Sequence, residues 1–245
     1  MPVLGYGIDQ SRPMEVQRCV LDAIAIGYRL IDTAQVYGNE EAVGNAINMC
    51  GVPRDEIFLT TKIWISSAGY EKAKHAMEES LRRMQTDYID LMLIHQPFGD
   101  YYGTYRAMEE VYNEGWIRAI GVANFYPDRL VDLCNFADIP PAVNQLETHV
   151  FQKQKEVRNY MDKYNVQPGA WVPFGESRKE ISPNPALVKI ADKYGKTVAQ
   201  ITLRYLIEKG IVAISKSWNK EQMKDNFNVF DFQLNGEDKA QIEVV

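Results

Sequence analysis

The stretch LIDTAQVYGNE, residues 30–40, decides the predicted fold. Its apolar start is typical of a short buried strand, and Gly38 with Asn39 supplies a turn and a helix N-cap. Asp32 and Tyr37 therefore lie where a strand gives way to a helix. In α/β folds the side chains at the carboxyl ends of the strands face a common crevice. We therefore expect an acid and a phenol in such a crevice.

Two more polar residues occupy equivalent positions further along the chain. Lys62 ends the strand pattern of residues 57–62, and His95 follows the strand pattern of residues 89–94. Four strand ends or following loops thus offer Asp, Tyr, Lys and His. Taken singly, each of these residues has an ordinary structural alternative: a helix cap, a packing tyrosine, a solvated charge or a loop histidine.

Strand and helix patterns alternate along the whole chain. The expected strands are residues 3–7, 28–31, 57–62, 89–94, 117–122, 142–146, 166–172 and 211–214. The expected helices are residues 13–26, 40–49, 70–84, 105–114, 128–135, 154–164, 185–194, 198–209 and 220–227. This alternation predicts an α/β fold, a single (β/α)8 TIM barrel domain over residues 1–245. An open doubly wound sheet is the alternative, but no Gly-x-Gly-x-x-Gly follows the first strand.

The composition is that of an ordinary globular protein, with 46% hydrophobic residues in a chain of 245. The net charge of -6 argues against a nucleic-acid surface, although a locally basic pocket for a small anion stays open. No apolar run approaches the roughly 20 residues of a membrane span, and the N-terminus lacks the shape of a signal peptide. The scattered cysteines lead us to expect a cytoplasmic protein, and the lack of a paired-histidine motif leads us to expect no metal site. We also expect a monomer.

Five motifs carry a resemblance to a known family. They are DTA (32–34), YGNE (37–40), TKIW (61–64), LIH (93–95) and GVANF (121–125). With these motifs the chain resembles the aldo-keto reductase family, in particular its microbial members related to diketogluconate and glyoxal reductases, from Leu4 to about Asp238. The resemblance implies an NADPH-dependent oxidoreductase that reduces aldehydes, dicarbonyls or keto sugars to alcohols.

The resemblance implies a catalytic tetrad of Asp32, Tyr37, Lys62 and His95. Carbonyl reduction needs a hydride donor at the carbon and a proton donor at the oxygen. Tyr37 suits the second role if its pKa, about 10 when unperturbed, comes nearer the working pH. We expect the Lys62 ammonium to lower that pKa and Asp32 to pair with Lys62. His95 would orient the carbonyl oxygen as a hydrogen-bond donor and share the proton transfer.

A nicotinamide cofactor follows from the same resemblance, NADPH first and NADH as the alternative. In the family an Asn and a Gln bind the carboxamide of the nicotinamide, and an aromatic ring stacks on it. The matching residues here are Asn124, Gln145 and Trp171, and Phe174 belongs to the same cofactor-binding segment. The alternative for Trp171 is an aromatic residue of the barrel core.

The segment ISKS, residues 214–217, resembles the start of the family's adenosine phosphate site. Lys216, Ser217 and the N-terminus of the next helix suit a 2′-phosphate through charge and free backbone N–H groups. Asn226 would face the adenine. Gln222 stands where the family usually has an Arg. The loss of that charged guanidinium group should weaken discrimination for NADPH over NADH. We expect the NADP preference to be reduced but retained.

Trp64, His95 and Phe98 are the expected substrate-binding residues, forming an aromatic wall around a small polar carbonyl compound. Asp9 stands at the pocket edge, where the family has a larger and less charged residue. The family usually has an N-terminal hairpin and a C-terminal loop over the pocket, and we expect this chain to lack both. We therefore expect a more open pocket with broader substrate selection.

Two other functions compete with a reductase. The first is a nicotinamide-binding barrel with little turnover, used as a redox sensor or partner subunit. An intact tetrad argues against it, since nothing in a binding role requires both Tyr37 and Lys62. The second is a phosphate-binding isomerase barrel, which lacks its usual Gly-rich loops near the last strands and a recognisable Glu or Lys base.

Overall fold

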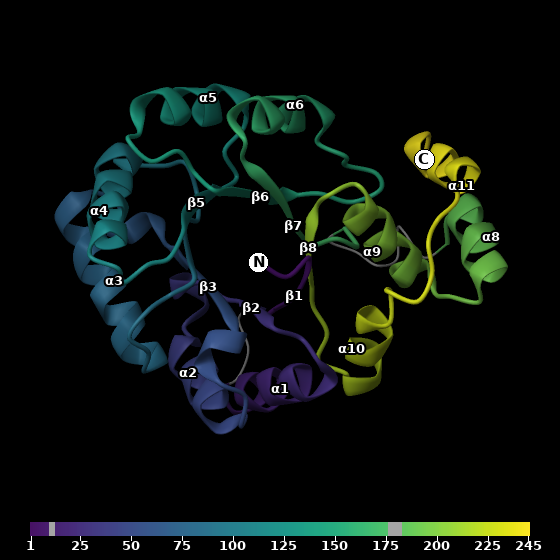
Figure 1. Cartoon of the computed structure of the whole chain (residues 1–245), viewed down its shortest axis with the longest axis horizontal. Coiled ribbons are helices and arrows are strands. Elements are labelled where there is room, and N and C mark those ends of the chain that lie inside the picture. The colour runs from purple at the N-terminus through teal and green to yellow at the C-terminus, as the bar shows by residue number, and fades with distance from the viewer. Residues whose placement is uncertain (10–12, 176–182) are drawn as a thin grey trace.

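Eight parallel strands close into a barrel in the computed structural model, which describes residues 1–9, 13–175 and 183–245 (Figure 1). The strands follow one another in sequence order, and β1 closes the barrel by pairing with β8. They are β1 (Leu4–Gly7), β2 (Leu30–Asp32), β3 (Phe58–Ile63), β4 (Leu91–Ile94), β5 (Ile120–Ala123), β6 (Val143–Glu147), β7 (Gln167–Trp171) and β8 (Val212–Ser215). The predicted TIM barrel is confirmed, and the open doubly wound sheet is wrong.

Helices form a ring around the strands (Figure 1). The described α-helices are α1 (Pro13–Ile26), α2 (Glu40–Met49), α3 (Tyr70–Met84), α4 (Tyr101–Asn113), α5 (Pro127–Phe136), α6 (Lys155–Tyr164), α8 (Pro185–Tyr194), α9 (Val198–Glu208), α10 (Lys220–Phe227) and α11 (Gly236–Glu243). Short 3-10 helices are η1 (Gln35–Tyr37), η2 (Arg54–Glu56) and η3 (Ile65–Ser67). At one side α8 packs against α9, and α11 packs against α8 (Figure 1).

Burial explains the sequence patterns of both kinds of element. Strands of a parallel barrel are covered on both faces, so they read as continuous apolar runs, and all four residues of β4 are buried. Each helix instead buries one face, as Val16, Val20 and Ala23 do at helical spacing on α1. Smaller clusters of strand side chains, including Leu91 and Leu93, fill the barrel interior. The barrel is therefore a packed core, and room for a ligand remains only at its ends.

The connection between β2 and α2 turns sharply, and this turn places Tyr37. Gly38 has a φ of 65°, the left-handed conformation that glycine adopts without strain, so the predicted turn is confirmed. Asn39 precedes α2 as predicted, but its side chain does not cap the helix. Instead Thr33 Oγ1 donates to Asn39 Oδ1 at 2.6 Å, and Asn39 Nδ2 donates to the Asp9 carbonyl at 3.0 Å. The asparagine therefore ties this turn to the segment after β1.

α4 and α11 differ from the sequence prediction by more than one residue at an end. α4 begins at Tyr101, ahead of its predicted start, because Asp100 Oδ1 caps it by accepting a backbone N–H at 2.8 Å. α11 has no counterpart among the predicted helices, because its apolar pattern is weak. Asn235 starts it by accepting the backbone N–H of Asp238 at 2.8 Å. In both cases the helix begins at a capping residue that is not followed by a clear helical repeat of apolar residues.

The described residues contain no candidate for a membrane span or for a metal centre. Within residues 1–9, 13–175 and 183–245, no helix is both long and apolar enough to cross a membrane. No group of three His, Cys, Asp or Glu side chains in these ranges is placed to hold a metal ion. Cys19, Cys50 and Cys134 are free thiols.

Candidate active site

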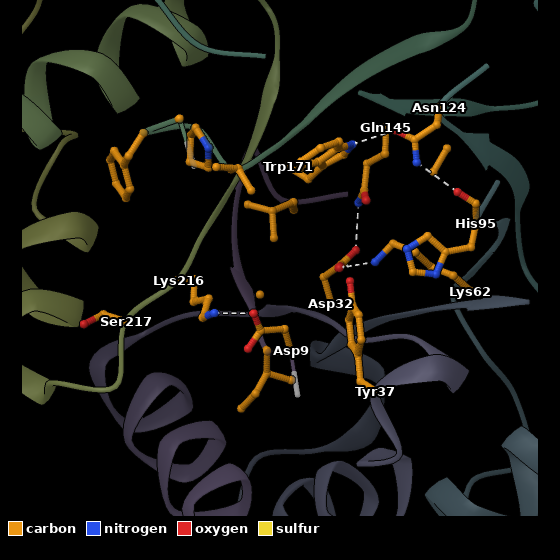
Figure 2. Close-up of a pocket in the computed structure, with 18 of the residues that line it drawn as sticks. Asp9, Asp32, Tyr37, Lys62, His95, Asn124, Gln145, Trp171, Lys216 and Ser217 are labelled. Carbon is orange, nitrogen blue, oxygen red and sulfur yellow. Dashed lines mark hydrogen bonds and ion pairs between the residues drawn. The ribbon is translucent and has the colours of Figure 1, made fainter. Parts of the chain in front are cut away.

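A cavity of about 930 Å³ opens where the strands of the barrel end. Asp32, Tyr37, Lys62 and His95 all line it, from β2, η1, β3 and the residue after β4 (Figure 2). Parallel strands finish at the same end of a barrel, which is why side chains distant in sequence meet there. The structure thus brings together the four side chains that the sequence placed in one crevice.

Asp32 and Lys62 form a buried ion pair, as the sequence predicted. Their side chains are only 7% and 4% exposed. Lys62 Nζ also donates to the Thr33 carbonyl at 3.0 Å, and Gln145 Nε2 donates to Asp32 Oδ2 at 2.7 Å. The carboxylate therefore holds Lys62 from one side while Gln145 holds the carboxylate from the other (Figure 2). This second link was not predicted.

The hydroxyl end of Tyr37 points toward Asp32 and Lys62 (Figure 2). Its ring packs edge-on against His95 at a centroid distance of 5.8 Å, and Lys62 Nζ lies 5.8 Å from the ring centre. Burial raises the pKa of Tyr37 above its ordinary value, while Lys62 lowers it by a smaller amount. The expected net lowering of this pKa is therefore wrong. Lys62 acts in the predicted direction, but removing the phenolate from water costs more.

His95 is a neutral side chain at physiological pH. Burial, reinforced by the Lys62 charge, lowers its pKa to about 3. Its ring packs against Trp64 at a centroid distance of 5.0 Å, and within the described residues its Nδ1 atom has no hydrogen-bond partner. A neutral imidazole has one N–H to donate, so His95 can orient an oxygen atom but is not a source of protons.

The side-chain amide of Asn124 links Trp171, at the end of β7, to His95, which follows β4. Trp171 Nε1 donates to Asn124 Oδ1 at 3.0 Å, and Asn124 Nδ2 donates to the His95 carbonyl at 2.9 Å. Asn124 has a φ of 63°, a left-handed conformation that asparagine tolerates. Gln145 Oε1 is buried and has no partner among the described residues. This free acceptor fits an amide N–H₂ donor such as the carboxamide of a nicotinamide.

At the end of the cavity where we predicted the phosphate site, the polar side chains already bond to one another. Lys216 is ion-paired with Asp9, and Ser217 Oγ donates to Gln222 Oε1 at 2.9 Å. Asn219 caps α10 by accepting the first backbone N–H groups at 2.9 and 3.1 Å. Fewer helix N–H groups than expected are therefore left for a phosphate.

The remaining predicted site residues differ in their positions. Phe174 lines the cavity and is 6% exposed. Trp64 packs against His95 and Phe98 is 59% exposed, and neither is among the residues that line the cavity. Asn226 also lies outside the lining but is buried, and its Nδ2 atom has no partner in the described part of the chain. That unused donor is suited to a ring nitrogen of an adenine.

The ion pair of Asp9 with Lys216 is the main feature that the sequence did not predict. Both residues line the cavity, and the negative charge of Asp9 is one cause of the raised pKa of Tyr37. A signal was present in the predicted fold, because β1 and β8 of a closed barrel are neighbours. Residues that follow those two strands must therefore meet at the rim.

Matches to known proteins extend over the entire barrel. The model of the Aldo/keto reductase family matches residues 4–245. Glyoxal reductase of Bacillus subtilis is 43% identical over 247 residues, which cover 100% of this chain and 89% of that protein. An aldo-keto reductase from a Medee basin deep-sea metagenome library superposes with a TM-score of 0.98 at 45% identity, covering 100% of this chain and 91% of the other. A Bombyx mori aldo-keto reductase in complex with NADP superposes with a TM-score of 0.93 at 36% identity. The match covers 100% of this chain and 89% of the Bombyx mori chain.

Proposed function

The chain belongs to the aldo/keto reductase family, and we propose that it reduces small aldehydes, dicarbonyls or keto sugars with NADPH, using Tyr37 as the proton donor. The observation that carries this proposal is the placement of the Tyr37 hydroxyl beside the Lys62–Asp32 ion pair inside the cavity. A bound, reduced nicotinamide supplies the hydride when it lies beside the carbonyl carbon. The chain supplies the proton for the carbonyl oxygen, a hydrogen bond that orients this oxygen, and a positive charge that stabilises the phenolate.

Tyr37 donates its proton to the carbonyl oxygen as negative charge develops there. An alkoxide is a far stronger base than a phenolate, so the transfer stays favourable with the pKa of Tyr37 raised by burial. Lys62 stabilises the phenolate that remains, and Asp32 keeps the ammonium in place. His95, neutral because its pKa is lowered to about 3, donates a hydrogen bond to the carbonyl oxygen and orients it.

The residues present fit a nicotinamide cofactor. Gln145 Oε1 offers a buried acceptor for the carboxamide, and Asn226 Nδ2 offers a buried donor for the adenine. Asn124 would also bind the carboxamide, Trp171 would stack on the nicotinamide ring, and Phe174 would contact the cofactor. Lys216, Ser217 and Gln222 would hold the 2′-phosphate end. The NADP bound to the related Bombyx mori structure supports the phosphorylated form.

The glyoxal reductase relative supports a small dicarbonyl as substrate. Trp64 would shape the pocket by packing against His95. Phe98, exposed and outside the cavity lining, stays a candidate for a substrate contact. We also propose that a monomer is active, because all four catalytic side chains line one cavity of one chain.

Oxidation of NADPH in the presence of methylglyoxal tests this function. The purified protein is expected to consume NADPH only when the carbonyl compound is present. With NADPH deuterated at the transferred position, the alcohol product is expected to carry one deuterium, measured by mass spectrometry. NADPH binding without turnover of any aldehyde or dicarbonyl would contradict a reductase and favour a sensor or partner subunit.

The kcat for carbonyl reduction is expected to stay nearly flat from about pH 6 to pH 9. Since the pKa of His95 is lowered to about 3 and the pKa of Tyr37 is raised, both groups keep their protonation state across this range. Initial rates at saturating NADPH and substrate measure the profile. A fall in kcat as the pH rises through the ordinary histidine range, near 6.5, would instead identify His95 as an acid.

A further inference from the structure

Asp9 and Lys216 form an ion pair at the rim of the cavity (Figure 2). Asp9 follows β1 and Lys216 follows β8, and these strands pair where the barrel closes. Their side chains are 44% and 42% exposed, so the pair is in contact with solvent. Asn39 Nδ2 holds the Asp9 carbonyl at 3.0 Å, which fixes the backbone that presents the carboxylate.

Lys216 is the cation on which the proposed phosphate site depends. Gln222 carries no charge, and its Oε1 atom is bonded to Ser217. Lys62 is the only other lysine among the described lining residues, and it is bound to Asp32 deep in the barrel. A phosphate that reaches Lys216 therefore meets a cation whose charge Asp9 already offsets.

We propose that Asp9 competes with the 2′-phosphate of NADPH for Lys216 and thereby sets how strongly the enzyme prefers NADPH over NADH. This inference rests on the proposed function and deepens it. Binding of NADPH exchanges the Asp9–Lys216 ion pair for a phosphate–Lys216 ion pair, so only the difference between the two contributes to affinity. NADH has no 2′-phosphate and leaves the original pair intact. Asp9 is thus a specificity-determining residue that acts against the phosphorylated cofactor.

The Asp9→Asn variant tests the competition directly. Its Kd for NADPH is expected to fall about two- to five-fold, the range that an exposed ion pair supports, while its Kd for NADH stays unchanged. Quenching of tryptophan fluorescence measures both constants, because Trp171 and Trp218 line the cavity. Asp162→Asn is the matched control. It makes the same change of charge at an exposed position on α6, outside the cavity lining, and should alter neither constant.

A double-mutant cycle shows whether Asp9 acts through Lys216. In the Lys216→Met background, Asp9→Asn is expected to leave NADPH affinity unchanged, because the contested cation is gone. Equal gains for both cofactors, or a gain that persists without Lys216, would overturn the inference.

The two proposals fail in distinguishable ways. A parent protein that shows no saturable NADPH binding would overturn the inference and the proposed function together. A parent that binds NADPH and reduces methylglyoxal, with an affinity that Asp9→Asn leaves unchanged, would overturn the inference alone.

Discussion

Replacement of Tyr37 by Phe is expected to lower the kcat for carbonyl reduction about a thousand-fold and to leave the Kd for NADPH within about two-fold. The substitution removes a single hydroxyl group. The ring remains, so its edge-on packing against His95 at 5.8 Å is preserved. Because burial raises the pKa of Tyr37, the hydroxyl is protonated at neutral pH, and the variant lacks this proposed proton source.

Single-turnover oxidation of NADPH with methylglyoxal measures this loss, and fluorescence titration measures the cofactor affinity. Tyr160→Phe is the matched control, since Tyr160 is a 37% exposed tyrosine on α6 outside the cavity lining. It should retain the parent kcat. If Tyr37→Phe kept more than about a tenth of the parent kcat, the proton would have to come from another group, and the assigned role would be wrong.

The barrel could be predicted because its signals are local. α3 matches its predicted bounds, since an amphipathic repeat between Gly69 and a left-handed Gln85 marks both ends. α11 was not predicted from the sequence because contacts with another helix, α8, support it. The Asp238 carboxylate accepts hydrogen bonds from Lys193 Nζ at 2.8 Å and Tyr194 Oη at 2.6 Å, both on α8. Such tertiary contacts do not produce a periodic pattern of apolar residues in the sequence.

The members of the candidate site could be predicted, but their electrostatics could not. Each tetrad residue lies at the end of a strand or in the segment that follows it, which is a local property. The direction of the Tyr37 pKa shift depends instead on how burial balances the Lys62 charge in three dimensions. The partnership of Asp9 with Lys216 joins residues 207 positions apart and needs the closure of the barrel. Sequence patterns show where charged residues lie along the chain. They do not show how burial and neighbouring charges combine to set a pKa or an ion pair.

Replacement of Lys62 by Met is expected to destabilise the fold by about 3–5 kcal/mol and to lower kcat about 100- to 1000-fold. The two losses have different causes. Stability falls because the buried Asp32 carboxylate, only 7% exposed, loses its counter-charge and keeps Gln145 as a neutral partner. Activity falls because no ammonium remains to stabilise the Tyr37 phenolate. Urea unfolding measures the first loss and NADPH oxidation the second.

Lys72→Met provides the control for Lys62→Met. Lys72 is exposed on α3, so the same change of side chain there should shift the free energy of unfolding by less than about 0.5 kcal/mol. A Lys62→Met protein as stable as this control would show that the buried carboxylate needs no counter-charge. The structural role assigned to the ion pair would then be wrong.

Adding Asp32→Asn to Lys62→Met separates the two roles of the ion pair. The double variant buries no unpaired charge, and Gln145 retains an oxygen to which it can donate, so most of the lost stability is expected to return. The kcat should stay low, because restoring the fold does not restore an ammonium beside Tyr37. Recovery of both stability and kcat would mean that Lys62 matters for catalysis only by holding the barrel end together. Recovery of stability alone assigns Lys62 to the chemistry of proton transfer.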